Sequence, residues 1–311
     1  MQKVTTSAHA KVILIGEHAV VYGQPAIALP LKTIQTHVTL QPSSHGQIIH
    51  SQLFDGELQQ INDRLKGTET LIHTLLTRLA TPQQPFTLTI TSDIPVERGM
   101  GSSAATALAI TKAFYAAFQQ PISDADLLTT AAISEQVIHG NPSGLDAATD
   151  NAQVPLWFVK NQPLRPIALN LQGYLIIADT GIQGQTKEAV SAVRQLRMQH
   201  PQTTQAALAK LGTLTKQAAT VLKQGNLKQL GTIMNQAQLI LKQLTVSSPQ
   251  LDQLVTVAQR AGAYGSKLTG GGRGGCMLAL TDTLTHANDI AHQLRQNGAQ
   301  KTWIVPLNLN N

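Results

Sequence analysis

The strongest chemical signal in the sequence is a segment rich in glycine and serine. It reads PVERGMGSSAA from Pro95 to Ala105, after an alternating segment typical of a strand and at the start of an alanine-rich segment typical of a helix. Glycines let the backbone turn tightly and approach a ligand closely. The free N–H groups of a helix's first turn attract anions, and the hydroxyls of Ser102 and Ser103 can reach a phosphate or its metal ion. We predict a phosphate-binding loop.

Three other interpretations compete with a nucleotide phosphate loop at this segment. A P-loop is excluded because no Gly-Lys-Ser/Thr closes the motif. A dinucleotide fingerprint matches Gly99, Gly101 and Ala104 in spacing. However, the acidic residue it needs about 20 positions further on is missing, because Asp124 and Asp126 begin a predicted helix. A purely structural turn would not explain the two serines.

A second segment, SEQVIHGNPSGLD at residues 134–146, carries two carboxylates. Glu135 lies near the end of a predicted helix that Gly140 terminates, and Asp146 follows a tight turn. One carboxylate could hold a magnesium ion while the other orients an attacking hydroxyl, and phosphoryl transfer needs both of these roles. Taken alone, such acids are more often surface residues; beside a phosphate loop, the catalytic interpretation is favoured.

Two further segments could contribute to a site. In residues 270–275 five of six positions are glycine, which indicates a close approach to a charged ligand or to a facing domain. Cys276 then begins a buried strand, and we assign it no chemistry. Near the N-terminus, Lys11 begins a predicted strand that ends at Glu17 and His18; taken alone, these are a strand-edge lysine and residues of a turn.

Hydrophobic periodicity predicts mixed strands and helices in both halves, and so an α+β chain of two domains. The proline-spaced residues 151–170 are the candidate boundary. Strands are expected at 11–15, 26–29, 33–40, 86–90, 173–178, 277–280 and 302–305, and helices at 61–80, 102–118, 124–139, 208–222, 230–244, 251–261 and 286–296.

Composition limits the partners. The net charge of +6 permits nucleic acid, an anionic membrane or a phosphorylated small molecule. Residues 189–251 contain no acid, and we interpret their lysines and arginines as solvated helix faces. The 4% of aromatic residues supplies few base-stacking platforms. A single cysteine excludes an internal disulfide, and the apolar runs are too short to span a membrane. We expect a cytoplasmic protein with no nucleic-acid or membrane partner.

In their order and spacing the four segments together resemble the GHMP kinase family, the small-molecule kinases of galactose, homoserine, mevalonate and phosphomevalonate. KVILIGEHAVVYG at 11–23 and IHGNPSG at 138–144 are similar to the branch that phosphorylates mevalonate. The resemblance covers about residues 4 to 285. It implies a ribosomal-protein-S5-domain-2-like α/β domain at 1–165 and a ferredoxin-like α+β domain at 166–311, with a last strand that is free to return to the first domain.

The resemblance also implies an activity, the phosphorylation of the 5-hydroxyl of (R)-mevalonate by ATP with Mg²⁺. Asp146 would be the catalytic base or only orient the hydroxyl, and Lys11 would steady the transferred charge. Ser103 and Glu135 would ligate Mg²⁺. The remaining roles fall to two sets of residues: Glu97, Arg98, Gly99, Met100, Gly101, Ser102 and Ser103 at the ATP phosphates, and Glu17, His18 and Thr180 at the substrate.

Alternatives remain open at this point. Another GHMP kinase, acting on phosphomevalonate, homoserine or a sugar, would carry the same motifs, and a non-catalytic nucleotide- or metabolite-binding member would keep the fold. The presence of Lys11, Ser103, Glu135 and Asp146 together favours an enzyme. Family members commonly have Pro-Gly before the lysine, where this chain has His9-Ala10, and Arg273 interrupts the glycine run. The resemblance leaves a homodimer open.

Overall fold

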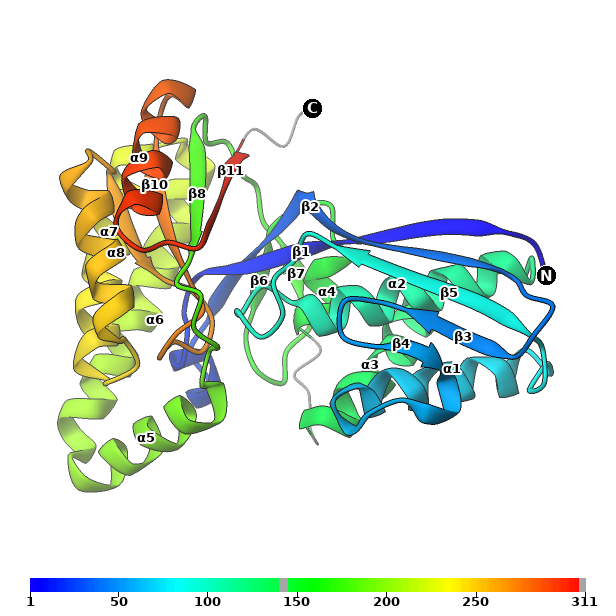
Figure 1. Cartoon of the computed structure of the whole chain (residues 1–311). Coiled ribbons are helices and arrows are strands. Elements are labelled where there is room, and N and C mark those ends of the chain that lie inside the picture. The colour runs from blue at the N-terminus through cyan, green and yellow to red at the C-terminus, as the bar shows by residue number, and fades with distance from the viewer. Residues whose placement is uncertain (140–144, 308–311) are drawn as a thin grey trace. The chain divides into compact units, whose positions relative to one another are not determined.

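The computed structural model describes residues 1–139 and 145–307, and the chain divides into two compact units. Unit 1 comprises residues 1–11, 30–96 and 101–152, and unit 2 comprises residues 12–29, 97–100 and 153 onward. The units interleave along the chain because β1 (Val4–Ile15) begins in unit 1 and ends in unit 2, whereas β2 (Ala26–Pro42) does the reverse (Figure 1). The expected domains 1–165 and 166–311 stay a prediction.

Unit 1 consists of strands and a group of helices that pack against one another. The alternation from Phe86 to Ser92 forms β5, whose Phe86 and Leu88 are buried. β5 runs antiparallel to the second part of β2 and parallel to a short strand, β3. The other elements are β3 (Gln47–His50), β4 (Asp55–Glu57), two 3-10 turns (Leu58–Gln60 and Asp63–Leu65), α1 (Lys66–Arg78), α2 (Ser102–Ala117), α3 (Asp124–His139) and α4 (Leu145–Asp150).

The two strands expected at 26–29 and 33–40 are one continuous strand, β2. Residues 26–28 pair with β6 (Leu156–Phe158), and residues 36–42 pair with β5. Pro30, which has no N–H to donate, lies between these two paired stretches. The proline is therefore accommodated within the strand.

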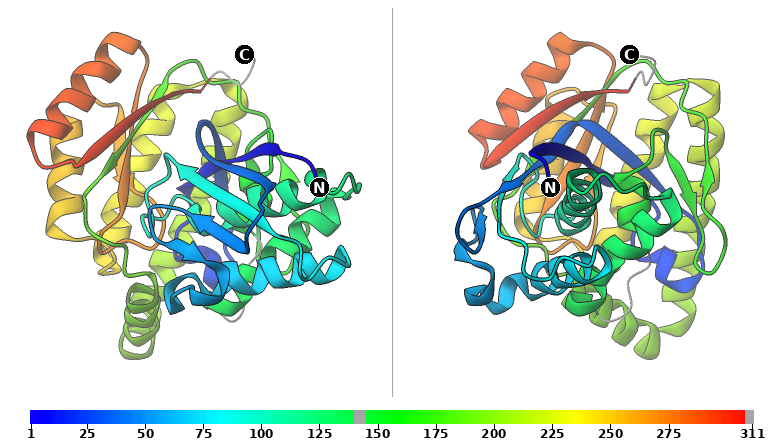
Figure 2. Two further views of the ribbon diagram at one scale, coloured as in Figure 1. Left: turned by 45° about the vertical axis from the view of Figure 1, so that its right-hand side comes forward. Right: turned by 90° about the vertical axis from the view of Figure 1, so that its right-hand side faces the viewer.

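Unit 2 is built on a four-stranded antiparallel sheet in the order β11-β8-β10-β9, with α7, α8 and α9 against it (Figure 2). The last strand pairs with β8 here rather than returning to the first domain. The elements are a 3-10 turn (Ala19–Tyr22), β7 (Arg165–Pro166), β8 (Tyr174–Asp179), α5 (Thr186–Gln199), α6 (Pro201–Gln224), α7 (Leu227–Gln243), α8 (Pro249–Arg260), β9 (Gly265–Leu268), β10 (Cys276–Thr281), α9 (Leu284–Gln296) and β11 (Lys301–Pro306).

Local sequence signals fix the helices of unit 2. Asn226, Ser248 and Thr283 each accept a hydrogen bond from a backbone N–H in the first turn of the helix that follows. α7 approaches β9 so closely that a Cβ on Gly265 would lie 2.1 Å from the Gly231 carbonyl oxygen, which explains glycine there. Within the described ranges, no helix combines the length and the apolar character that crossing a membrane requires.

Candidate active site

The predicted base and the predicted lysine meet in unit 1. Lys11 of β1 is 4% exposed, and its Nζ lies 3.0 Å from Asp146 Oδ1 in the first turn of α4. Burial lowers the pKa of Lys11, but the charges of Asp146 and Asp150 outweigh burial and raise it. The lysine is therefore a cation at neutral pH. The Asp146 side chain is 40% exposed, so its carboxylate is accessible from solvent.

Glu135 of α3 belongs to the same cluster. It is 6% exposed, and burial, together with the charge of Asp146, raises its pKa to about 7 against the opposing effect of Lys11. A carboxyl with that pKa is only partly ionised at neutral pH, and a nearby cation would favour its ionised form. This behaviour suits a residue that holds a metal ion.

Asp150 is a member of this cluster that the sequence analysis did not single out. It ends α4, four residues after Asp146, and it is fully buried. A backbone hydrogen bond from Ala105 acts to lower its pKa, but this is the smallest of the effects on the carboxyl. Burial first, and then the charge of Asp146, raise its pKa well above the usual range. The one signal in the sequence was the four-residue spacing, which places both acids on one side of a helix.

The predicted phosphate loop leads into the start of α2, as expected. The helix begins at Ser102, and Gly101 precedes it with φ +78°. A Cβ on Gly101 would lie 2.6 Å from Asp150 Oδ2, so this position requires glycine for its backbone conformation and for space. No side chain caps the helix at Gly101. Ser102 and Ser103 thus lie in the first turn, whose N–H groups suit an anion.

The other part of that loop, Glu97 to Met100, belongs to unit 2. Arg98 donates from Nε to Asp179 Oδ1 at 3.0 Å and from Nη2 to the Gly181 carbonyl oxygen at 2.9 Å. The Glu97 carbonyl oxygen accepts a hydrogen bond from the Gly184 N–H. The predicted phosphate-binding arginine is therefore an ion-pair partner of a buried aspartate here, and its role at ATP stays a prediction.

The three residues predicted at the substrate each contact the glycine-rich segment or the strand before it, all within unit 2. Glu17 forms a buried ion pair with Lys267 of β9. His18 Nε2 lies 2.9 Å from the Gly271 carbonyl oxygen, and burial lowers the pKa of this histidine to about 4, so the ring is neutral and Nε2 donates. Thr180 Oγ1 donates to the Gly275 carbonyl oxygen at 2.7 Å. These residues hold the glycine-rich loop, and their contact with substrate stays a prediction.

The two departures from the family pattern have local partners. His9 is buried in unit 1 with Nε2 2.9 Å from the Ala152 carbonyl oxygen. In unit 2, Arg273 has φ +55° and donates from Nε to the Thr245 carbonyl oxygen at 3.2 Å. The turn IHGNPSG lies mostly outside the described residues, apart from the backbone of its first two positions.

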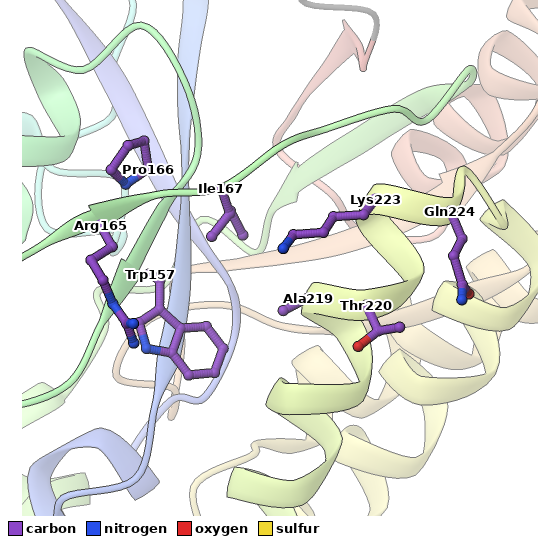
Figure 3. Close-up of a pocket in the computed structure, with 8 residues that line it drawn as sticks. All are labelled: Trp157, Arg165, Pro166, Ile167, Ala219, Thr220, Lys223 and Gln224. Carbon is purple, nitrogen blue, oxygen red and sulfur yellow. The ribbon is translucent and has the colours of Figure 1, made fainter.

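A pocket of about 570 Å³ lies elsewhere in unit 2, between the β6–β7 hairpin and the last turns of α6 (Figure 3). Trp157 and Arg165 are cross-strand neighbours on the hairpin side, and Lys223 lies on the α6 side. No predicted site residue lines it. The lining residues are Trp157, Arg165, Pro166, Ile167, Ala219, Thr220, Lys223 and Gln224.

The chain belongs to the GHMP kinase family: the model of the GHMP kinase N-terminal domain matches residues 68–150, and that of the C-terminal domain matches residues 218–300. A mevalonate kinase of Thermococcus sibiricus is 33% identical over 89% of both chains. A solved L. major mevalonate kinase in complex with R-mevalonate has a TM-score of 0.86 at 26% identity, covering 97% of this chain and 95% of that one. A mevalonate kinase from methicillin-resistant Staphylococcus aureus has a TM-score of 0.77 at 32% identity, covering 99% of both. The predicted two-domain α+β GHMP kinase fold is confirmed.

Proposed function

We propose that this chain is an enzyme that phosphorylates the 5-hydroxyl of (R)-mevalonate with ATP, giving 5-phosphomevalonate and ADP. The observation that carries the proposal is the Lys11–Asp146 ion pair, a buried cation beside an accessible carboxylate, in a chain of the GHMP kinase family. The similarity to mevalonate kinases over 89% of the chain supports mevalonate as the acceptor. These relatives favour mevalonate over phosphomevalonate, homoserine or a sugar.

The proposed reaction is a single displacement. The mevalonate hydroxyl oxygen bonds to the γ-phosphorus of ATP, the bond from that phosphorus to the β-bridging oxygen breaks, and ADP leaves. Asp146 accepts or orients the hydroxyl proton, a role worth roughly 10² to 10⁴ in rate. The Lys11 cation, beside Asp146, offsets the negative charge of the transferred phosphoryl group, and the first turn of α2 offers N–H groups to the phosphates. Aligning two anionic reactants supplies much of the remaining acceleration.

Ser103 and Glu135 are the residues proposed to hold Mg²⁺. Glu135 fits this role because it is a nearly buried carboxyl whose pKa is raised by burial and by the charge of Asp146, so that a bound cation would favour its ionised form. When bound with ATP, Mg²⁺ neutralises phosphate charge during transfer. Glu97 to Met100 complete the proposed ATP loop, and Glu17, His18 and Thr180 act on the substrate side, directly or through the glycine-rich loop they hold. A homodimer and a cytoplasmic location stay predictions.

The test is ADP release with mevalonate, phosphomevalonate, homoserine and galactose as acceptors. We expect turnover on mevalonate, and a kcat lower by roughly 10² to 10⁴ in Asp146→Asn. Asp289→Asn is the matched control, because Asp289 is an exposed aspartate of α9 in unit 2. Unchanged turnover in Asp146→Asn would contradict the role of Asp146, and turnover on another acceptor alone would contradict the substrate.

A further inference from the structure

The pocket between the β6–β7 hairpin and α6 in unit 2 has the composition of a ligand site. Its volume of about 570 Å³ falls within the range of small-molecule pockets, roughly 300–1,000 Å³. Such pockets have mainly apolar and aromatic walls with a few placed polar groups. The lining follows this pattern, with the apolar side chains Trp157, Pro166, Ile167 and Ala219 and the polar side chains Arg165, Thr220, Lys223 and Gln224.

Hydrogen bonds fix the two walls of this pocket relative to each other. The Ile167 N–H donates to the Pro155 carbonyl oxygen at 2.9 Å and closes the hairpin. Three residues later, Asn170 donates from its backbone N–H to the Leu222 carbonyl oxygen at 2.9 Å, and from Nδ2 to the Lys223 carbonyl oxygen at 2.8 Å. The hairpin is thus tied to the last turn of α6, so the pocket is formed without a ligand.

The pocket carries positive charge that no nearby segment offsets. Arg165 and Lys223 are both exposed, and neither forms an ion pair with another described residue. Figure 3 shows the Lys223 side chain extending from α6 toward the hairpin that carries Arg165. Residues 153–178 and 189–251, which include every lining residue, contain no Asp or Glu. Two cations without a counter-ion favour a ligand with two negative charges.

Trp157 supplies an aromatic surface and a donor that lacks an acceptor. Its Nε1–H is buried and has no hydrogen-bond acceptor among the residues that the structure describes, although a buried indole usually has one. Arg165 is the cross-strand neighbour of Trp157, so both side chains lie on one face of the hairpin. An oxyanion held by this arginine is an acceptor of the kind that the indole N–H lacks, and a flat ring suits stacking on the indole.

We propose that unit 2 binds a small organic dianion in this pocket, namely a phosphate monoester that carries a flat apolar ring. Arg165 binds the phosphate oxygens in the paired geometry that a guanidinium favours, and Lys223 neutralises the second charge. The ring packs on the Trp157 indole. A phosphate monoester carries close to two negative charges near neutral pH, which matches the two cations. The site shares no residue with the candidate active site, so the inference does not depend on the proposed phosphoryl transfer.

The test is tryptophan fluorescence of the full chain titrated with phenyl phosphate. Trp303→Phe leaves Trp157 as the only tryptophan, because the chain has two. We expect a saturable change in Trp157 fluorescence. Affinity should be at least roughly 10-fold lower for inorganic phosphate, which lacks the ring, and for benzyl alcohol, which lacks the charge. Absence of a saturable change, or equal affinity for either of these partial probes, would overturn the proposal.

Variants in the same Trp303→Phe background locate the site. Arg165→Gln and Lys223→Gln should each bind phenyl phosphate at least roughly 10-fold more weakly, because each removes a charge-assisted hydrogen bond. Ala219→Leu keeps both charges but should also weaken binding, because the larger side chain fills part of the pocket. Lys210→Gln is the matched control, because Lys210 is exposed on the same helix and lies roughly 20 Å along it from Lys223.

Three results from these variants would contradict the inference. Unchanged affinity in both Arg165→Gln and Lys223→Gln would show that the probe binds elsewhere, and an equal loss in Lys210→Gln would show that only general positive charge matters. Tighter binding of benzoate, which carries one charge, would contradict a dianion. The urea-unfolding midpoints of Arg165→Gln and Lys223→Gln should match the wild type, which separates weaker binding from misfolding. Phenyl phosphate binding without turnover on mevalonate would refute only the proposed function.

Discussion

Replacing Lys267 by methionine tests whether the buried ion pair with Glu17 holds unit 2 together. The two side chains are 0% and 1% exposed, and Lys267 Nζ also donates to the Leu268 carbonyl oxygen at 2.6 Å. Burial lowers the pKa of Lys267, although the charge of Glu17 opposes this effect. Methionine keeps most of the side-chain volume but leaves the Glu17 carboxylate buried without this counter-ion. Removing one member of such a pair costs about 3–5 kcal/mol.

The assay is urea unfolding followed by circular dichroism. With a slope near 3 kcal/mol/M, the loss corresponds to a midpoint lower by about 1 M or more. Lys210→Met is the control, because Lys210 is exposed on α6. The free energy of unfolding of this variant should stay within about 0.5 kcal/mol of the wild type. The double variant Glu17→Gln/Lys267→Met should recover much of the loss, since no charge remains buried.

Two results would refute this reasoning. A midpoint for Lys267→Met that matches Lys210→Met would show that the ion pair contributes little. Additive losses in the double variant would show that the two side chains act independently, whereas contacting partners normally couple by about 0.5–3 kcal/mol.

Three further outcomes are expected. Gly101→Ala should lower the free energy of unfolding by about 2–4 kcal/mol, because alanine is strained at this positive φ and its Cβ would clash with Asp150. Adding Asp150→Ala should restore only the part of this loss that comes from the clash, as measured by chemical denaturation. Because the pKa of Glu135 is raised to about 7, its contribution to stability is full below pH 4.5 and is lost as the pH rises through about 7. Glu135→Gln should therefore raise the unfolding temperature at pH 8 in EDTA but not at pH 4.5. The same change in unfolding temperature at both pH values would contradict this. Cys276 is buried, and burial raises the pKa of its thiol, so a thiol reagent should modify it roughly 100-fold more slowly in the native chain than in concentrated guanidinium; rapid native modification would show that β10 is accessible.

Local sequence signals predicted the elements that carry the site. The start of α2 at Ser102 followed from the glycine-serine motif. Ser248-Pro249, an N-cap residue with proline at the first helical position, stands just before the helix expected at 251–261, and in α8 the serine accepts from the Leu251 N–H at 3.3 Å. These signals act within one turn of helix, so a single sequence contains them. The resemblance assigned Lys11 and Asp146 to one reaction site, which no local pattern could supply.

Long-range partners could not be predicted in the same way. Glu17 and Lys267 are 250 positions apart, and nothing in the spacing of either residue indicates the other. Asp150 lay outside the predicted motifs, and its burial depends on how α4 packs against α2. The sequence predicted separate strands at 26–29 and 33–40, yet β2 is continuous, and its two paired stretches lie on either side of Pro30.

The interleaved course of the chain has a consequence for how this protein must be made. Residues 12–29 belong with unit 2, most of which comes after residue 152. At roughly 5–20 residues per second, the ribosome needs about 6 to 25 seconds to reach the partners of this early segment. During that interval the apolar stretches around Val12 to Ile15 and Ala26 to Leu29 have not yet met the rest of their unit. Chaperone dependence during synthesis should therefore centre on this early segment, and separately expressed halves of the chain should fail to fold independently.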